Sequence, residues 1–504
     1  MTLPTRVVET HISSLFFVGD RVYKRKKPVR NGFLDFTTVE SRRIACRREV
    51  DLNRRLAPDI YLGVADLRLE GIDSGVDGGV TSPGEALDHL VMMRRLPEER
   101  RLSARLDSST VGSDLRDVAR LMATFHVSAL RSPAIDDASG HAALSALWTQ
   151  GLEQIAPFAP SILDRDGLHR IAQLSRDYLA GRHDLFDQRI SDGRACDGHG
   201  DLQAEDIFIL DDGPRILDCL EFNDLLRFGD VLSDVAFLAM DLERLGHPEL
   251  GGSFLDDYRA LSCDRWPDSL AHHYMAYRAH VRSKVACLRH EQGDPDAADA
   301  ARGLHDQCLD HLESGRVRLV LVGGSPGTGK SSVSRALSDH LDAVLLSTDT
   351  IRDEILPRTD CEAVPTFDGL HTGRYTPVRV AAVYRELLRQ ADVALAAGQS
   401  VVLDASWLDP QQRERARALG DDTTSILSEF RCVCPENLAA ARIQQRIDVG
   451  TSASEATPDL AQGLAAAAPP WPNAQLLDTT RPLALNVEAA AHLTGDGRPS
   501  SGRR

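Results

Sequence analysis

A glycine-rich run in the second half of the chain has the residue types and spacing of a phosphate-binding loop. It consists of Gly324, Ser325, Pro326, Gly327, Thr328, Gly329, Lys330, Ser331 and Ser332, and its first eight residues fit the pattern G-x-x-x-x-G-K-S. Glycines let the backbone wrap closely around a phosphate, so that its N–H groups form an anion nest at a helix N-terminus. We expect Lys330 to bridge the β- and γ-phosphates of ATP and Ser331 to ligate Mg²⁺.

Two carboxylates follow apolar segments in the same half of the chain. Asp349 ends the segment that starts at Leu345, and Asp404 comes directly after Val401–Val402–Leu403. Parallel sheets place functional groups at the carboxyl ends of their strands. We therefore expect Asp404 to support the metal and Asp349 to accept a proton from a substrate hydroxyl, with Arg352 gripping the acceptor. A helix N-cap is the competing explanation for each acid.

A second constellation of acids lies in the first half. The residues from His199 to Asp206 have the spacing H-x-D-x-x-x-x-N, with Asp206 at the position of the asparagine. In this pattern Asp201 would be the catalytic base, and Asp206 and Asp218 would hold Mg²⁺. His199 alone would be explained as a buried core histidine, but the order and spacing of all four residues favour a nucleotide site.

The partners of these acids are expected upstream. Lys24 lies at the end of a short strand and Glu49 on the following helix, a pairing that would orient the α- and β-phosphates. Lys26 and Lys27 are neighbours of Lys24, so the sequence leaves open which lysine contacts phosphate. Met93, which closes a further strand, would lie at the hinge that contacts adenine.

Regular elements must hold these residues in place. In the second half, strand-like segments at Arg318 to Val322, Ala343 to Leu346 and Ser400 to Leu403 alternate with helical segments, which predicts a parallel sheet with crossover helices. The first half begins with short strands and a helix over Ser41 to Leu56, and it becomes mostly helical after Val111. This order predicts a small mixed lobe followed by a helical lobe.

The length of 504 residues exceeds what one core supports, so two or more domains are expected. The predicted domains are a kinase-like domain over 1–300, with its small lobe at about 1–95 and its helical lobe at about 96–300, and a P-loop domain over 316–490. The stretch from Glu291 to Gly315 is interpreted as the end of a helix followed by a connection, and residues 491–504 as a flexible tail. Fold class is therefore predicted as α/β and α+β, multidomain.

Composition excludes several kinds of protein. The net charge of −17 disfavours a nucleic-acid binder. The apolar runs are much shorter than the ~20 residues of a membrane-spanning helix, and the first residues have no apolar signal core. Nine scattered cysteines favour reduced thiols over a disulfide or zinc framework. We expect a cytoplasmic protein without a membrane partner, and its oligomeric state stays open.

Several of these motifs resemble known families. The segment from Gly398 to Leu408 is similar to small-molecule P-loop kinases such as the shikimate and gluconate kinases and the zeta-toxin-like enzymes. This resemblance implies that Asp349 acts near the acceptor and that arginines of a lid grip the phosphates. Arg442 and Arg446, four residues apart on a predicted helix, occupy the matching region. A solvated arginine face explains that pair equally well.

The first half resembles the aminoglycoside and choline kinase group, because His199–Gly200–Asp201 matches that group's loop and Asp218 is not followed by Phe-Gly. There, an Asp of the helix that begins near Gly229 tethers the catalytic loop. The order of the two halves resembles bacterial fused proteins with an aminoglycoside phosphotransferase-like domain and an ATP-binding domain. Tyr23–Lys24, and the run from Arg48 to Tyr61, carry much of this resemblance.

Together these patterns predict an ATP- and Mg²⁺-dependent kinase with two nucleotide-binding modules and a small-molecule alcohol as acceptor. One alternative is a regulatory protein with a pseudokinase first half and a P-loop switch in its second half. Another is a polynucleotide kinase, which the acidic charge disfavours. Asp201 discriminates between the first two, because only the enzyme needs it as a base.

Overall fold

The computed structural model describes residues 6–10, 12–31, 34–68, 71–73, 86–356, 376–449 and 457–495. The chain divides into two compact units. The first comprises Met1–Ala172, Phe186–Trp266 and Ala271–His311, and the second comprises Gln173–Leu185, Pro267–Leu270 and Leu312–Arg504. Two short segments from the first half of the sequence therefore cluster with the second unit, which local sequence patterns do not predict.

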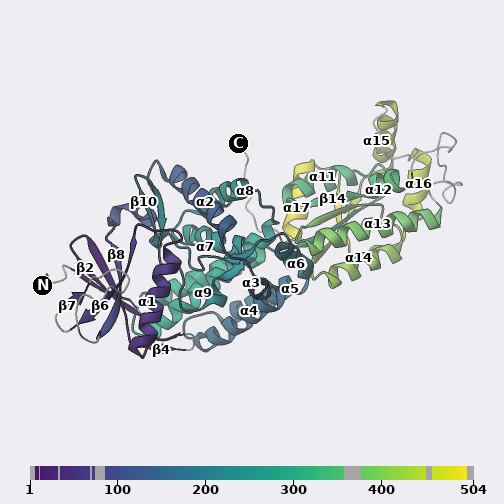
Figure 1. Ribbon diagram of the computed structural model, residues 1–504. Coiled ribbons are helices and arrows are strands. Elements are labelled where there is room, and N and C mark those ends of the chain that lie inside the picture. Colours follow the sequence, from purple (N-terminus) through teal and green to yellow (C-terminus); the bar gives the residue numbers. More distant parts are fainter. Residues whose placement is uncertain are drawn as a thin grey trace. The chain divides into compact units, whose positions relative to one another are not determined.

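The first unit begins with an antiparallel six-stranded sheet of order β1-β2-β3-β8-β6-β7 (Figure 1). The helix α1 packs against β8 and β6, and Thr38 caps its N-terminus by accepting a hydrogen bond from the Ser41 N–H. The elements of this lobe are β1 (Arg6–Glu9), β2 (Ser13–Val18), β3 (Arg21–Lys26), β4 (Arg30–Asn31), β5 (Leu34–Asp35), α1 (Val39–Asn53), β6 (Tyr61–Arg68), β7 (Gly71–Asp73) and β8 (Asp88–Arg94).

The rest of the first unit is mainly helical, with two small two-stranded sheets, β10-β11 and β12-β9. Its helices surround α7, which is buried along almost its entire length. The elements that follow β8 are α2 (Val111–Ser128), α3 (Pro133–Ser139), α4 (His141–Ile155), α5 (Arg165–Ala180), α6 (His183–Ser191), β9 (Ala195–Asp197), β10 (Ile207–Leu210), β11 (Gly213–Ile216), β12 (Phe228–Asp230), α7 (Val231–Arg244), α8 (Pro248–Ser262), α9 (Asp268–Glu291) and α10 (Ala297–Ser314).

The second unit is built on a five-stranded parallel sheet of order β14-β15-β13-β16-β17. The central strand β13 is fully buried and is apolar after Arg318, as expected for a parallel strand covered on both faces. Its elements are β13 (Arg318–Gly323), α11 (Lys330–Leu341), β14 (Val344–Ser347), α12 (Thr348–Ile355), α13 (Pro377–Ala396), β15 (Val401–Asp404), α14 (Pro410–Asp422), β16 (Ile426–Val433), α15 (Glu436–Val449), α16 (Pro458–Ala466), β17 (Gln475–Asp478) and α17 (Leu483–Leu493).

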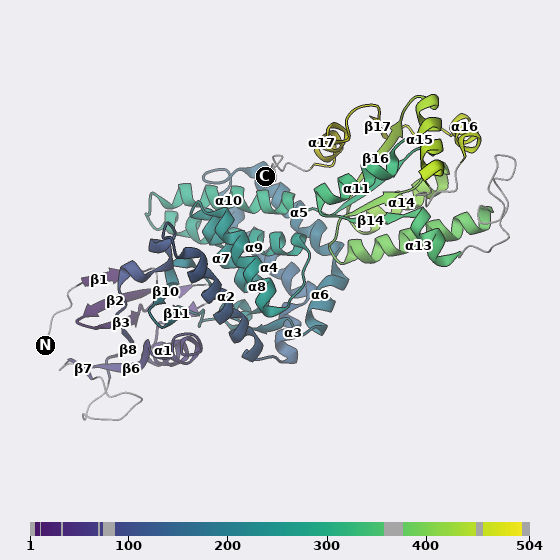
Figure 2. The same ribbon diagram turned by 90° about the horizontal axis from the view of Figure 1, so that it is seen from above.

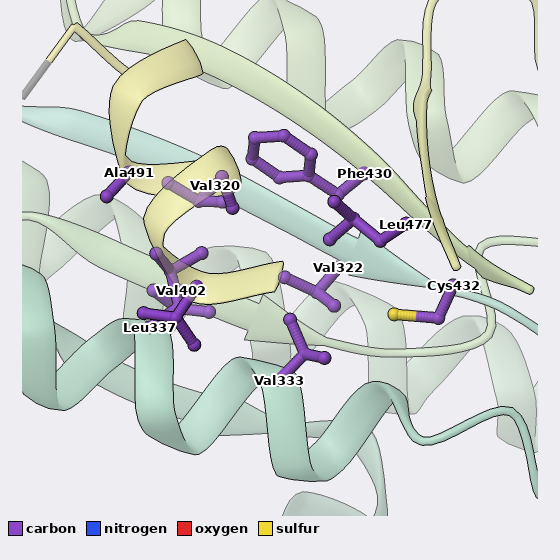
Figure 3. Close-up of a cluster of buried hydrophobic side chains, with 11 residues drawn as sticks. Val320, Val322, Val333, Leu337, Val402, Phe430, Cys432, Leu477 and Ala491 are labelled. Carbon is purple, nitrogen blue, oxygen red and sulfur yellow. The ribbon is translucent and has the colours of Figure 1, made fainter. Parts of the chain in front are cut away.

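Helices cover both faces of this sheet (Figure 2), with α13 packed on β14 and β15 and with α11 and α17 packed together on the other face. Figure 3 shows the core under α11 and α17. Val320 and Val322 of β13 point into it, and Val333 and Leu337 of α11 pack against them. This core fixes the start of α11 at the end of β13, where the glycine-rich run connects them.

The predicted fold class is confirmed, since the chain combines a unit that has a sheet-based small lobe and a helical lobe with a parallel P-loop α/β unit. Two local predictions were wrong. Residues 297–314 form helix α10 instead of a connection. Residues 491–493, assigned to the tail, form the last turn of α17, and residues 496–504 of that tail lie outside the described residues. None of the helices in the described ranges is both long and apolar enough to cross a membrane.

Candidate functional site

A cavity of about 840 Å³ lies between the sheet and the helical lobe of the first unit. This volume lies within the range of about 300–1,000 Å³ that is typical of small-molecule sites. The predicted site residues that line it are Lys24, Met93, Asp201, Asp206 and Asp218. Acids that are separated in the sequence thus meet at one cavity, opposite a lysine of the sheet.

The structure distinguishes the three neighbouring lysines. Lys24 lines the cavity, and its Nζ lies 2.5 Å from Asp218 Oδ1 and 2.9 Å from Glu49 Oε1. Lys26 is fully buried and pairs with Glu49 and Glu221, while Lys27 pairs with an exposed acid. Of the three lysines, Lys24 is therefore the one that lines the cavity.

The charge of Lys24 is fixed by its neighbours. Burial alone lowers the pKa of Lys24, but the carboxylates of Asp218 and Glu49 outweigh burial and raise that pKa well above its ordinary value. Glu49 is completely buried, and the two lysines beside it keep its pKa below the ordinary value despite that burial. Glu49 therefore holds Lys24 as a permanent cation at the edge of the cavity.

Asp218 has an unusual backbone conformation, with a φ of +62° in the left-handed region. Its N–H donates a hydrogen bond of 3.2 Å to the hydroxyl of Tyr61, a residue of β6 that also lines the cavity. A left-handed residue other than glycine costs about 1–3 kcal/mol and persists where its surroundings hold it, often at functional sites. The Tyr61 contact and the Lys24 pair hold Asp218 toward the cavity.

Burial raises the pKa of the other two acids that line the cavity, Asp201 and Asp206. Burial raises the pKa of Asp201 to about 6, although Arg282 and Arg278 lower it. Burial, with the negative charges of Asp218 and Asp201, raises the pKa of Asp206 well above its ordinary value. Gln203 Nε2 donates a hydrogen bond of 2.9 Å to Asp201 Oδ1 and orients its carboxylate. A cation between these acids would relieve their repulsion.

The loop that carries Asp201 is tethered by Asp234 of α7. Its carboxylate accepts hydrogen bonds from the backbone N–H of His199 (2.6 Å) and of Gly200 (2.8 Å), and it lies 3.3 Å from His126 Nε2. A second acid of the same helix, Asp241, accepts from the N–H of Ala204. The helix α7 thereby fixes the conformation of the loop that carries Asp201.

His199 has a structural role. Its Nε2 lies 3.1 Å from the carbonyl oxygen of Leu217, which links the catalytic loop to the segment before Asp218. Burial lowers the pKa of His199 to about 4, so the ring is neutral near pH 7 and can donate to this carbonyl. This contact couples the positions of Asp201 and Asp218.

We expect Asp234→Ala to lower the free energy of unfolding by about 2–4 kcal/mol, because each buried N–H group left without an acceptor costs about 1–3 kcal/mol. Urea unfolding followed by circular dichroism measures this loss. The control Asp299→Ala removes an exposed carboxylate that pairs with Arg302 on its own helix, and it should change stability by less than about 0.5 kcal/mol. Equal stabilities of the two variants would contradict the tether.

The second unit places the glycine-rich run between β13 and α11, as its motif predicts. Gly327 and Gly329 have φ values of +82° and +87°. A Cβ atom at Gly327 would lie 2.5 Å from the carbonyl oxygen of Ala439, so the close approach of α15 also requires glycine there. Thr328 Oγ1 donates to the carbonyl of Ser325 within the loop. Lys330 and Ser331 form the first residues of α11.

Asp404 ends β15 directly beside this loop, with its Cα paired to Val322 of β13. It is buried, which raises its pKa, while Lys330 and a hydrogen bond from Ser331 lower it. One of its carboxylate oxygens, Oδ1, has no hydrogen-bond partner among the described residues. A buried oxygen without a donor suits a cation, and carboxylate and hydroxyl oxygens are ligands that Mg²⁺ prefers.

Asp349 lies in the first turn of α12, and its carboxylate pairs with Arg352 Nη1 at 2.6 Å. The N-cap of α12 is Ser347, whose side chain accepts from the Asp349 N–H, so the cap explanation for Asp349 is wrong. Ser347 and Asp404 are paired neighbours on adjacent strands. Asp349 and Asp404 therefore lie at the same edge of the sheet, free of capping roles.

Of the two predicted lid arginines, Arg442 lies at the phosphate loop. It donates to Thr479 Oγ1 (3.1 Å) and to the Thr479 carbonyl (2.8 Å), and Thr479 Oγ1 in turn donates to the carbonyl of Thr328. Arg446 is half-buried one turn further along α15. Sequence patterns missed Thr479, whose only signal is its position after strand β17.

Metal binding in both units would rest on few protein ligands. In the described part of the chain, no group of three or more His, Cys, Asp or Glu side chains could hold a metal ion by itself. Mg²⁺ is commonly held by one or two carboxylates together with substrate phosphates. The pair Asp206 and Asp218, and the pair Ser331 and Asp404, fit this description.

Comparison with known proteins supports the division into two modules. A family model described as an AAA domain matches residues 319–470, which confirms the predicted P-loop module. An uncharacterized protein of Mycobacterium tuberculosis is 41% identical to the chain over 490 residues, covering 97% of the chain and 95% of that protein. That relative therefore spans both units.

Two solved structures are similar to separate parts of the chain. A choline/ethanolamine kinase family protein from Mesorhizobium loti is 13% identical and covers 62% of the chain and 89% of its own, with a TM-score of 0.40. A sugar kinase from Janibacter sp. is 19% identical and covers 35% of the chain and 93% of its own, with a TM-score of 0.26.

Proposed function

We propose that this chain, which belongs to the same family as the Mycobacterium tuberculosis relative, is an ATP-dependent phosphotransferase with two nucleotide-binding modules. Each module would transfer a γ-phosphoryl group mainly by positioning and charge neutralisation. The acceptor would be a hydroxyl group of a small molecule. The premise of this proposal is that a P-loop module is joined to a second unit whose cavity is lined by a lysine and three aspartates at kinase-like spacing.

One observation carries the proposal for the first module: Lys24, Asp201, Asp206 and Asp218 face a single cavity. In the proposed reaction Asp201 accepts the proton of the acceptor hydroxyl, while the oxygen of that hydroxyl attacks the γ-phosphorus. Lys24, held by Glu49, orients the phosphates. Met93 of β8, which also lines the cavity, would lie beside the adenine.

Mg²⁺ held by Asp206 and Asp218 would supply neutralisation of the phosphate charge in this module. The two carboxylates fit that role because they face the cavity and their repulsion raises the pKa of Asp206. In the second module, Ser331 and Asp404 would hold the ion. Lys330 would bind the triphosphate there. Asp349 would take the proton from the hydroxyl of the acceptor, and Arg352 would hold the Asp349 carboxylate in place.

The direct test measures transfer from γ-labelled ATP to water and to a mixture of polyols and sugars. The full-length Lys330→Ala variant is used, because it removes the P-loop contribution. We expect Mg²⁺-dependent transfer to persist in this variant and to need Asp201. Transfer that disappears completely in Lys330→Ala would contradict catalysis by the first module.

The pH dependence of this activity follows from Asp201, whose pKa burial raises to about 6. A general base must be ionised, so activity is present above this pKa and is lost as the pH falls through it. We expect kcat/KM of the Lys330→Ala variant to rise with pH and to level off above about pH 6–7. A profile that stays flat between about pH 5 and 7 would contradict Asp201 as the base.

A regulatory protein with a pseudokinase first half is the second candidate. The observation that favours it is the ion pair of 2.5 Å between Lys24 and Asp218, which occupies both groups in this structure. Two variants discriminate between this candidate and the phosphotransferase. If Asp201→Asn leaves all transfer intact while Lys330→Ala abolishes it, the first module is a nucleotide sensor and the second module is the catalyst.

A further inference from the structure

The cavity of the first unit extends beyond the catalytic acids to a wall formed by α4 and α9. The two helices pack together through Trp148 and Tyr277, whose rings meet edge to face at 5.3 Å. Lys284 of α9 also donates to Gln154 of α4 at 2.7 Å. Both helices line the cavity, and α9 contacts the loop that carries Asp201 through the hydrogen bond from Arg278 to the Gly200 carbonyl, so this wall is near the predicted base.

One face of α9 supplies most of this wall. Its lining residues recur at helical spacing and include Tyr277, Arg278, Val281, Arg282, Val285 and Leu288. The residues of α4 that line the cavity are Leu144, Leu147, Gln150 and Gln154. Among the described lining residues from these two helices there are cations, apolar groups, tyrosines and two glutamines, but no carboxylate.

The two arginines of this wall have different surroundings. Arg278 is anchored, since its guanidinium donates to the carbonyl oxygens of Gly200 and Ser233 and lies over the ring of Phe237. Arg282 is half-buried, and no ion pair or hydrogen bond joins its guanidinium to another residue in the described ranges. Its charge nevertheless acts on Asp201, where it is the largest influence that opposes burial.

A half-buried guanidinium that lines a cavity and makes no direct ion pair within the described residues has free donors for an anionic ligand, because its planar N–H groups match carboxylate and phosphate oxygens. We propose that the phosphoryl acceptor of the first module is an alcohol that carries an anionic group, which Arg282 binds while apolar side chains of α4 and α9 contact its carbon skeleton. This inference rests on the proposed function, because it assigns the acceptor of the same site.

Electrostatics of the whole cavity agrees with this assignment. The carboxylates that line the cavity, among them Asp201, Asp206 and Asp218, all come from elements other than α4 and α9, whereas α9 contributes three cations. These cations are Arg278, Arg282 and Lys284. An anionic acceptor would be repelled by the acids unless a cation held its charged group away from them. A cationic acceptor would instead have to bury its charge beside Arg282.

The test compares three matched probes: 4-(hydroxymethyl)benzoate, benzene-1,4-dimethanol and 4-(aminomethyl)benzyl alcohol, which are anionic, neutral and cationic. Calorimetry measures their binding to the full-length Lys330→Ala variant in the presence of Mg²⁺ and the non-hydrolysable nucleotide AMP-PNP. One charge-assisted contact leads us to expect that the anionic probe binds about tenfold more tightly than the other two.

Two further variants assign the preference to a residue. Arg282→Gln, added to Lys330→Ala, should remove the preference for the anion while leaving the affinity for AMP-PNP unchanged. The matched control Arg289→Gln removes an exposed arginine of the same helix that pairs with Asp294 and does not line the cavity, and it should keep the preference.

The outcomes separate the inference from the proposed function. Absence of AMP-PNP binding to the Lys330→Ala variant would refute the proposed function and the inference together. Nucleotide binding without preference for the anionic probe, or without binding of any probe, would overturn the inference alone. A loss of AMP-PNP affinity in Arg282→Gln, with the probe preference kept, would assign Arg282 to nucleotide binding. That result would also overturn the inference.

Discussion

Replacing Asp201 by asparagine should lower the turnover of the first module by about 10²–10⁴-fold, which is the usual contribution of a positioned general base. The substitution preserves the shape of the side chain and can still accept the hydrogen bond from Gln203. It removes the negative charge of the carboxylate and with it the ability to accept a proton. Nucleotide affinity should therefore change little, because Lys24, Asp206 and Asp218 remain.

This prediction is measured as transfer from γ-labelled ATP in the Lys330→Ala background. The control Asp211→Asn removes an exposed carboxylate of the neighbouring hairpin, which pairs with Arg100 and lies outside the cavity. Its rate should equal that of the parent. An unchanged rate in Asp201→Asn would show that another group accepts the proton or that the first module does not catalyse transfer.

Replacing Lys330 by alanine should weaken nucleotide binding to the second module by about 10²-fold, since it removes a charge-assisted contact to the phosphates in a partly buried site. Loop geometry should persist, because it depends on Gly327, Gly329 and the Thr328 hydrogen bond. The loss would therefore reflect the missing ammonium group alone.

A fluorescent ADP analogue, titrated into full-length Asp218→Ala protein with and without Lys330→Ala, reports on this module. The control Arg389→Ala removes an exposed cation of α13 that pairs with Glu386 on the same helix, and it should leave the affinity unchanged. If Lys330→Ala binds the analogue as tightly as its parent, the glycine-rich run is not the nucleotide site of the second unit.

Features encoded by contiguous residues could be predicted well from the sequence. The glycine-rich run needs only a strand before it and a helix after it, and β13 and α11 supply both. The strand that carries Lys24 and the helix that carries Glu49 were also predictable from their spacing. The structure adds the choice of Lys24 over Lys26, because burial against Glu221 cannot be read from neighbouring residues.

Contacts between distant segments could not be predicted in this way. Thr479 joins Arg442 to the phosphate loop only because β17 lies at the edge of the sheet beside β16. Arg282 lines the cavity because α9 packs against the loop that carries Asp201, which the sequence of this polar helix does not reveal. The helix α10 was predicted as a connection although its buried residues recur at helical spacing. Its first buried positions, Ala297 and Ala301, are small alanines among polar residues, so the buried face does not stand out as an apolar stripe.

The central claim is that one chain holds two nucleotide sites. Calorimetric titration of the full-length protein with AMP-PNP and Mg²⁺ tests it most directly. We predict two nucleotides per chain in the wild type, one in Lys330→Ala and one in Asp218→Ala. A wild-type stoichiometry of one that disappears in Lys330→Ala would contradict the claim.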